Sequence, residues 1–555
     1  MQKNNSIKID EKSNATSAIK LFEQTSIFKS LFKIVFLAIV VSLASGIYVF
    51  ADQILMVKLL PINPHYNSQD VFGENYKAIE IIKDKGLDQY INTDVASVIR
   101  TAISLSSPLT VVCTAITLLL GLGISINYSK MLGKKDYQKA KETWSNGFFL
   151  TLFFSIGTSI ILCLINEPII NAQSKSTNLN QILSQINNSK SIIISDSEIK
   201  EINNFLSKSQ NLSLTWANNY SYVLLSLNFL NAYTMVFISL LNSEGKNGIP
   251  TIFIILANII NVGLDSLLLL FTSIGIVGAA IATVMSWILS TSIFVGYIYN
   301  LNRKNDTLLL FSGLNIKKFK FDKKIILLIF AIGVSSFFRN ASTAIFSFTQ
   351  QSIYGNITTE VTGKQNSYYL TILGAVNPIF NLFYSAIIGI IRGARTVITY
   401  NYAKNNVENI KKAFLISILM SIVYSTLFFI FVVLILPNEF LWIFNITSES
   451  GNYNDAKLIL VATMSQLPIF GLSVSGMLYF QSTDKPITSL ISSIMYGVII
   501  GIPGLFIAKL LSESAKNINY FIYAPLIIMS IAGILVFSYS FWHLFLRKRK
   551  IYIEY

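Results

Sequence analysis

Residues Ile249–Ser290 read IPTIFIILANIINVGLDSLLLLFTSIGIVGAAIATVMSWILS, two apolar segments joined by a few small residues. Each segment approaches the roughly 20 apolar residues that cross a bilayer. The first carries one carboxylate, Asp265, with Asn261 one helical turn before it on the same face. A charged side chain inside a membrane segment is costly, so it persists mainly where function or a partner requires it. The stretch therefore predicts two membrane-spanning helices that hold a functional carboxylate.

A second acid, Asp52, lies equally deep in an apolar run, IYVFADQIL, with Tyr48 one turn before it. At about 1.5 Å per residue, Asp52 lies roughly 12 Å below the outer end of its expected span. By the same measure Asp265 lies roughly 9 Å deep, and Thr283, in the segment after it, roughly 14 Å. Three segments therefore place oxygen atoms at similar depth. Each carboxylate could instead be structural, bonded to a neighbouring helix, and Asn261 and Thr283 could be ordinary interhelical hydrogen bonders.

The composition is that of a polytopic membrane protein. Of the 555 residues, 52% are hydrophobic and 13% are charged, which is far from ordinary soluble usage. The net charge of +15 comes from lysines and arginines that cluster between and beside the apolar runs. That placement is typical of cytoplasmic loops and lipid contacts, and it argues against a nucleic-acid surface. No metal-ligand cluster, paired loop acids or nucleophile motif suggests an enzyme or a cofactor.

The apolar runs predict an all-α protein with twelve transmembrane helices in two pseudo-symmetric six-helix lobes. The expected spans are Phe32–Leu60, Ala96–Ile126, Trp144–Ile165, Tyr220–Leu241, the two segments of 249–290, Ile325–Tyr354, Tyr368–Ile391, Ala413–Leu436, Leu458–Phe480, Ile487–Leu511 and Phe521–Leu546. An even count puts both termini on one side, and the strongly basic segments fall on that side too. We therefore expect both termini in the cytoplasm of a multi-pass plasma-membrane protein, which we take to be a monomer.

The domain boundaries follow from this count. We expect a cytoplasmic tail at 1–30, an N-lobe at 31–299, a basic cytoplasmic linker at 300–324, a C-lobe at 325–546 and a cytoplasmic tail at 547–555. Two outer insertions, about 61–95 and 168–217, interrupt the N-lobe. The second is rich in Asn and Ser and has too little apolar density for a core. A weak repeat supports the two halves: LGKKDYQKAKE follows the second span, and YAKNNVENIKK follows the eighth, at a shift of 270 residues.

These motifs resemble those of the multidrug and toxic compound extrusion (MATE) transporters. The likeness is carried by the Glu-Gly loop and Asn-x-x-x-Asp run of LLNSEGKNGIPTIFIILANIINVGLDS, by GIVGAAIAT after it, and by IYVFADQI in the first span. The resemblance implies export of organic, often cationic, compounds driven by Na⁺ or H⁺. It also implies an ion-coupling site at Asp52, Asn261, Asp265 and Thr283, with Tyr48 as a possible supporting residue and no metal other than Na⁺.

Two departures from the family pattern concern the C-lobe. The Gln-Pro that many members carry after the eighth span is Arg395-Thr396 here, and no Asp or Glu lies deep in the last six spans. The N-lobe site must therefore provide the coupling. We expect an antiporter that exports small amphipathic, cationic organic compounds by alternating access of its two lobes. The alternative within the superfamily is a flippase of lipid-linked sugars, whose pyrophosphate would need basic cavity residues, and Arg339 and Arg100 are the candidates. Arg339 could also snorkel or pair within its own span.

Overall fold

The computed structural model describes residues 27–547 except 134–135, 187–193, 245, 247, 312–313, 315–320 and 484. The expected tails and the basic residues Lys134, Lys135, Lys317, Lys318 and Lys320 therefore lie mostly or wholly outside the described residues. Throughout the described ranges the ordered elements are helices, without a strand. Eleven of these helices are long and apolar enough to cross a membrane, and the bent pair α8 and α9 makes a twelfth crossing. The all-α architecture predicted from the sequence is confirmed.

The N-lobe contains seven long helices because its fourth crossing is broken. They are α2 (Ile27–Leu59), α5 (Val95–Gly133), α6 (Tyr137–Asn171), α8 (Asp196–Ser226), α9 (Asn228–Ser243), α10 (Gly248–Phe271) and α11 (Val277–Arg303). The axis bends by 47° between α8 and α9, at Leu227, which is inside the span expected at 220–241.

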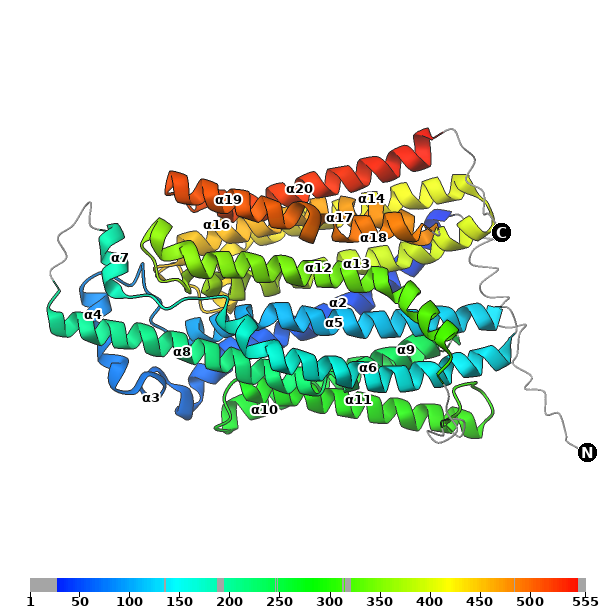
Figure 1. Cartoon of the computed structure of the whole chain (residues 1–555), viewed down its shortest axis with the longest axis horizontal. Helices are drawn as coiled ribbons and strands as arrows, with labels where there is room; N and C mark the ends of the chain where they lie inside the picture. Colours follow the sequence, from blue (N-terminus) through cyan, green and yellow to red (C-terminus); the bar gives the residue numbers. More distant parts are fainter. Residues whose placement is uncertain are drawn as a thin grey trace, which may run out of the picture.

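The C-lobe repeats this arrangement with more interrupted helices. Its elements are α12 (Lys323–Thr362), α13 (Tyr368–Ala403), α14 (Val407–Phe429), α15 (Pro437–Ile443), α16 (Tyr453–Met464), α17 (Gln466–Ser482), α18 (Pro486–Ile494), α19 (Gly501–Ala515) and α20 (Asn519–Phe541). Wider π-helical turns continue α14, join α18 to α19 and end α20. Figure 1 shows the long helices of both lobes running along one axis, with α5 and α12 side by side where the lobes meet.

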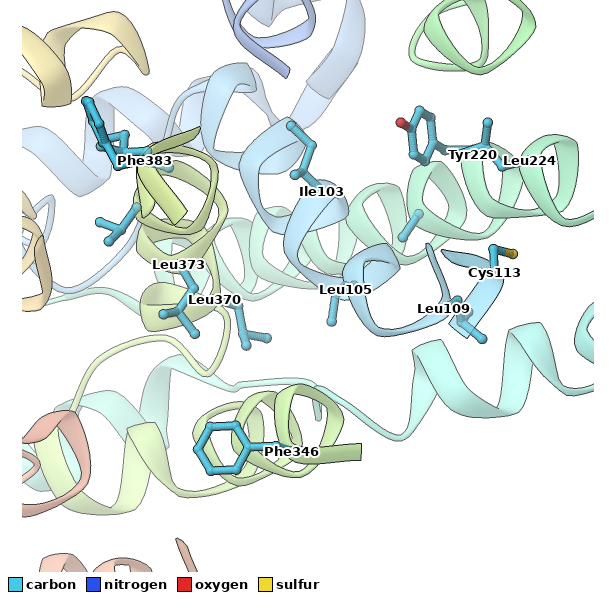
Figure 2. Close-up of a cluster of buried hydrophobic side chains, with 14 of the residues drawn as sticks. Ile103, Leu105, Leu109, Cys113, Tyr220, Leu224, Phe346, Leu370, Leu373 and Phe383 are labelled. Carbon is cyan, nitrogen blue, oxygen red and sulfur yellow. The ribbon is translucent and has the colours of Figure 1, made fainter. Parts of the chain in front are cut away.

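The lobes contact each other chiefly through α5 against α12 and α2 against α13. Glycines allow this close approach, as small residues do in membrane helices. A Cβ added to Gly393 of α13 would lie 2.7 Å from Val35 Cα of α2. Figure 2 shows α5 within a buried cluster, with Ile103 and Leu105 between Tyr220 of α8 and Leu373 of α13. The helix α5 therefore packs against both lobes along the molecular centre.

The two insertions gather at one end of the bundle, which we call the insertion end. There α3 (Ser68–Phe72), α4 (Lys77–Asp84) and α7 (Leu179–Ile186) surround the first turns of α8, while α20 ends at the opposite end of the bundle (Figure 1). The two insertions therefore lie at the end of the bundle opposite to the end of the last span, as the count of twelve spans predicts.

The expectation that residues 168–217 bury little is wrong. Ile202, Phe205 and Leu206 of α8 are at most 2% exposed, and the Phe205 ring lies 4.9 Å from that of Phe72 in α3. These apolar residues recur at helical spacing among polar ones, so the average composition concealed a buried helix face. The insertion also reaches the C-lobe, because Asn366 N donates to Thr177 Oγ1 at 3.0 Å.

Candidate functional site at the acids of the N-lobe and the cavity beside them

The helix α10 turns a narrow stripe of side chains into the N-lobe. Ala257, Asn261, Asp265 and Leu269, four residues apart, are buried, while many of the apolar residues between them face outward. This one-sided pattern points Asn261 and Asp265 toward the neighbouring helices, and both are fully buried. The helix α11 follows through the left-handed turn at Gly275 and brings the buried Thr283 against the same stripe.

The structure brings together all five residues singled out in the sequence. Thr283 Oγ1 lies 3.5 Å from Tyr48 Oη and 3.5 Å from Asn261 Nδ2, and both groups donate to it. The carboxyl groups of Asp52 and Asp265 are close enough to interact directly. The residues come from α2, α10 and α11, the three segments whose matched depth suggested that they meet.

A sixth residue, Tyr220 of α8, belongs to the same group, and the sequence analysis missed it. Its hydroxyl donates to Asp52 Oδ2 at 3.5 Å, and the ring is buried. Tyr220 is the first residue of the expected fourth span, a position where a tyrosine normally marks the membrane interface. No sequence signal distinguished it from such an interface residue, since its place in the group depends on the fold bringing its hydroxyl to Asp52 of α2.

The group has more acceptor oxygens than donors. Asp52 Oδ1, both carboxyl oxygens of Asp265 and Asn261 Oδ1 are buried without a hydrogen-bond donor among the described residues. Two adjacent carboxylates repel each other when both are charged, and burial adds a desolvation cost. A cation or a shared proton removes both costs. Carboxylate and amide oxygens are the ligands that hard cations prefer, so these residues fit either Na⁺ or H⁺.

A cavity of about 440 Å³ lies between the lobes and touches this group directly. Tyr48, Asp52, Tyr220 and Thr283 form part of its N-lobe wall. Ser106, Ser107 and Thr110 of α5 add hydroxyl groups, and Asn381, Tyr384 and Arg392 of α13 line the C-lobe side. A molecule in this cavity would contact both the acidic group and the C-lobe wall.

The acidic group and Arg392 lie far apart along the axis of the bundle. Gly393, next to Arg392, packs against Val35 of α2. Asp52 is 17 residues further along α2, or about 25 Å at 1.5 Å per residue, toward the insertion end. The two charged walls therefore face different ends of the cavity.

Arg100 does not line this cavity, which corrects its expected candidacy as a cavity cation. The side chain is 1% exposed and donates from Nη1 to the Phe444 carbonyl oxygen at 2.6 Å. Its Nη2 also lies 3.5 Å from Asp94 Oδ2. Nearby, Lys58 Nζ donates to Asn445 Oδ1 at 2.6 Å. Arg100 and Lys58 of the N-lobe thus hold the C-lobe turn at 444–445, near the insertion end.

The other arginines left open by the sequence lie close together in the C-lobe. Arg395 of α13 donates a hydrogen bond from Nη2 to Gln481 Oε1 of α17. Arg339 of α12 and Arg392 of α13 are both near enough to Arg395 to repel it. Arg339 is half-buried and also neighbours Tyr384 of the cavity wall. Arg392 was not predicted as a cavity residue because the eighth span was expected to end at Ile391, whereas α13 continues to Ala403.

Comparison with known proteins agrees with this architecture. The MatE family model matches residues 96–195 and 343–507. An uncharacterized MG447 homolog of Mycoplasmoides gallisepticum is 30% identical over 538 residues, covering 94% of this chain and 91% of the relative. The Staphylococcus aureus (strain MRSA252) multidrug export protein MepA is 26% identical over 418 residues, covering 74% of this chain and 79% of MepA.

Solved MATE-family transporters of the MOP superfamily share the fold. One in an outward-facing conformation superposes with a TM-score of 0.65 at 17% identity, over 95% of this chain and 97% of that one. One in an inward-facing conformation gives 0.64 at 18% identity, over 89% and 98%. Two six-helix lobes around a central cavity, with membrane-crossing helices throughout, define a multi-pass membrane transporter. The chain belongs to the MATE family.

Proposed function

We propose that this protein is a secondary antiporter that exports small amphipathic organic compounds in exchange for Na⁺ or H⁺. The observation that carries the proposal is the excess of buried acceptor oxygens at Asp52, Asp265 and Asn261, directly beside the cavity. A buried pair of carboxylates in which three of the four oxygens lack a donor is costly unless a cation or a proton accompanies it. Binding of the ion and binding of the cargo can therefore be linked through one cavity wall.

The coupling would work through the position of the acidic group between helices of the N-lobe. Asp52 is on α2, and Asp265 and Asn261 are on α10, so an ion bound between them draws these helices together. The helix α2 also packs against α13 of the C-lobe. A change in α2 on ion binding would therefore alter the contact between the lobes, and the cavity would open to one side or the other. Alternating access follows if ion and cargo favour opposite states.

The name of MepA, a multidrug export protein, supports small organic compounds as the cargo. The positive-inside pattern of the sequence supports a plasma-membrane location with both termini in the cytoplasm and the insertion end outside. We take the working unit to be a monomer, because the cavity and the acidic group are complete within one chain. The flippase alternative is favoured by one specific observation, the group of arginines in the C-lobe.

Gradient-driven efflux tests the proposal. Purified protein in phosphatidylcholine vesicles is given a Na⁺ or an H⁺ gradient separately, and efflux of ethidium, a cationic dye, and of 8-anilinonaphthalene-1-sulfonate, an anionic one, is followed. We expect efflux of at least one dye to depend on one gradient and to be lost in Asp265→Asn. The exposed Asp70→Asn is the matched control and should behave as wild type. Gradient-dependent efflux that persists at the wild-type rate in Asp265→Asn would refute the proposal.

A further inference from the structure

Three arginines form a group that the ion-coupling account does not use. Arg392 and Arg395 are three residues apart on α13, so they share a helix face. Arg339, on α12, lies near enough to both to repel them. We call these three residues the arginine group. Like charges held close together repel each other, so a bound anion would stabilise such a group.

The arginine group lies within the length of two membrane-crossing helices rather than at their ends. Arg339 is 16 residues, or about 24 Å, beyond the start of α12 at Lys323. Arg392 is 11 residues, or about 16 Å, before the end of α13 at Ala403. Arginines at such depth are costly and normally face a bundle interior or a water-filled cavity. Here Arg392 lines the central cavity, and its side chain is exposed there although α13 runs between the lobes.

Arg395 keeps a hydrogen-bond donor that no neighbouring group accepts. Within the described part of the chain, neither Arg339 nor Arg395 forms an ion pair. The neutral Gln481 accepts one bond from Arg395, while Arg395 Nε is buried without an acceptor. This is the reverse of the acidic group of the N-lobe, where the acceptors lack donors.

We propose that the arginine group is a subsite for the anionic headgroup of an amphipathic molecule, with phosphate as the best-fitting group. A guanidinium presents planar paired donors that match phosphate oxygens, and three of them offset a charge of about −2. The apolar part of the molecule would extend along the cavity toward the Ser106–Thr110 face of α5. Calling this molecule the cargo rests on the proposed transport function, but the binding itself does not. It replaces the cationic cargo expected from the resemblance.

Calorimetric titration of the full-length protein in phosphatidylcholine nanodiscs tests the subsite. Hexyl phosphate is the probe, and hexyltrimethylammonium, with the same chain and opposite charge, is its partner. We expect hexyl phosphate to bind the wild type and the ammonium compound to bind at least about tenfold more weakly. Arg392→Gln should weaken hexyl phosphate about tenfold or more, since a charge-assisted hydrogen bond is lost. Arg392→Lys should recover part of the affinity, because it restores the charge but not the planar donors.

Arg303→Gln, at the end of α11, is the matched arginine control and should bind as wild type. Arg395→Gln and Arg339→Gln repeat the test from different helices, so misfolding of one variant does not decide it. Equal affinity for the two hexyl compounds, or unchanged hexyl phosphate binding in all three glutamine variants, would overturn the proposal.

A phosphate group can belong to a soluble amphiphile or to a lipid, and two further arms separate these sources. If the occupant is a lipid, nanodiscs of phosphatidylglycerol should compete with hexyl phosphate, and labelled phosphatidylglycerol should move between vesicle leaflets faster with wild type than with Arg392→Gln. If the occupant is soluble, neither effect appears and hexyl phosphate still binds. The outcome is independent of the antiporter proposal: hexyl phosphate binding without gradient-driven efflux refutes only the antiporter, and gradient-driven efflux without such binding refutes only the subsite.

Discussion

The N-lobe and C-lobe walls of the cavity carry charged groups of opposite sign. Asp52 of the acidic group lines the N-lobe wall, and Arg392 of the arginine group lines the C-lobe wall. Behind these two residues, both carboxyl oxygens of Asp265 lack a donor and Arg395 Nε lacks an acceptor. The backbone positions of Asp52 and Arg392 lie at different levels along the bundle, so the two groups occupy different parts of the cavity wall. An acidic wall and a basic wall in one cavity fit two ligands of opposite sign. The two-ligand account that we propose therefore places the ion in the N-lobe and the cargo headgroup in the C-lobe.

The largest expected effect concerns the acidic pair, and its absence would mean that the N-lobe wall does not bind the coupling ion. Asp52→Asn and Asp265→Asn should each reduce gradient-driven efflux by about 100-fold or more, because each removes a charge that the ion needs. The double variant should be no slower than either single, since residues that act as a unit are not additive. Efflux rates under separate Na⁺ and H⁺ gradients measure this. If the fold reduction in the double variant equals the product of the reductions in the two single variants, the two acids act independently.

A second prediction moves the arginine group without changing its charge. Gly393→Val places a side chain where even a Cβ would lie 2.7 Å from Val35 Cα, so α13 must move away from α2. Overpacking of this kind costs about 1–3 kcal/mol. We expect a lower thermal unfolding midpoint and about tenfold weaker binding of hexyl phosphate. Gly296→Val is the control, because a Cβ there has open space. Wild-type affinity for hexyl phosphate in Gly393→Val would mean that the subsite does not depend on the α2–α13 contact.

A third prediction sharpens the choice of ion. Thr283→Val removes the oxygen that accepts from Tyr48 and Asn261, and a metal ion needs more oxygen ligands than a proton does. The Na⁺ concentration for half-maximal efflux should rise about fivefold, roughly 1 kcal/mol, while H⁺-driven efflux changes less. Thr291→Val, on the same helix but bonded to Thr234, serves as the control. An equal loss with both ions would make Thr283 a packing residue rather than a ligand.

The smallest effect is expected at the insertion end, outside both proposed sites. Lys58→Met removes the hydrogen bonds from Nζ to the Trp442 carbonyl oxygen and Asn445 Oδ1, which link the lobes. In a background without the native cysteines, a cysteine at position 107 should react about threefold faster with a membrane-impermeant maleimide, since the open state becomes more populated. Lys83→Met, exposed on α4, is the control. An unchanged labelling rate would mean that this contact does not limit opening.

The sequence predicted the acidic group far better than the arginine group, and the physical reason is the rarity of buried acids. Asp52 and Asp265 interrupt long apolar runs. Because a charged residue inside a membrane span is energetically costly, both acids could be recognised as candidate site residues. The rise per residue of a helix then predicted that they lie at a common depth. Arg392 follows an equally apolar run, but arginines also mark cytoplasmic helix ends. The expected span therefore ended at Ile391, directly before Arg392, whereas α13 continues to Ala403. Tyr220 and the contacts of Arg100 depend on which helices pack together, which a single sequence does not specify.

The insertion at 168–217 shows that the average composition of a segment can conceal a buried helix face. Its Asn and Ser content suggested a loop, yet Ile202, Phe205 and Leu206 form one buried face of α8. Three apolar residues at positions i, i+3 and i+4 are enough to dock a helix when a neighbouring surface exists. That surface is supplied by α3 and α4, which lie in the other insertion. Neither insertion alone revealed the core that they build together.

The most direct test of the two-ligand account measures both ligands on the same variants. Binding of Na⁺, proton release and binding of hexyl phosphate are determined by calorimetry for wild type, Asp265→Asn and Arg392→Gln. The account predicts that Asp265→Asn loses ion binding and keeps its affinity for hexyl phosphate within about twofold, and that Arg392→Gln does the reverse. Loss of both ligands in either variant, with a folded protein, would contradict the division of the cavity into an ion wall and a headgroup wall.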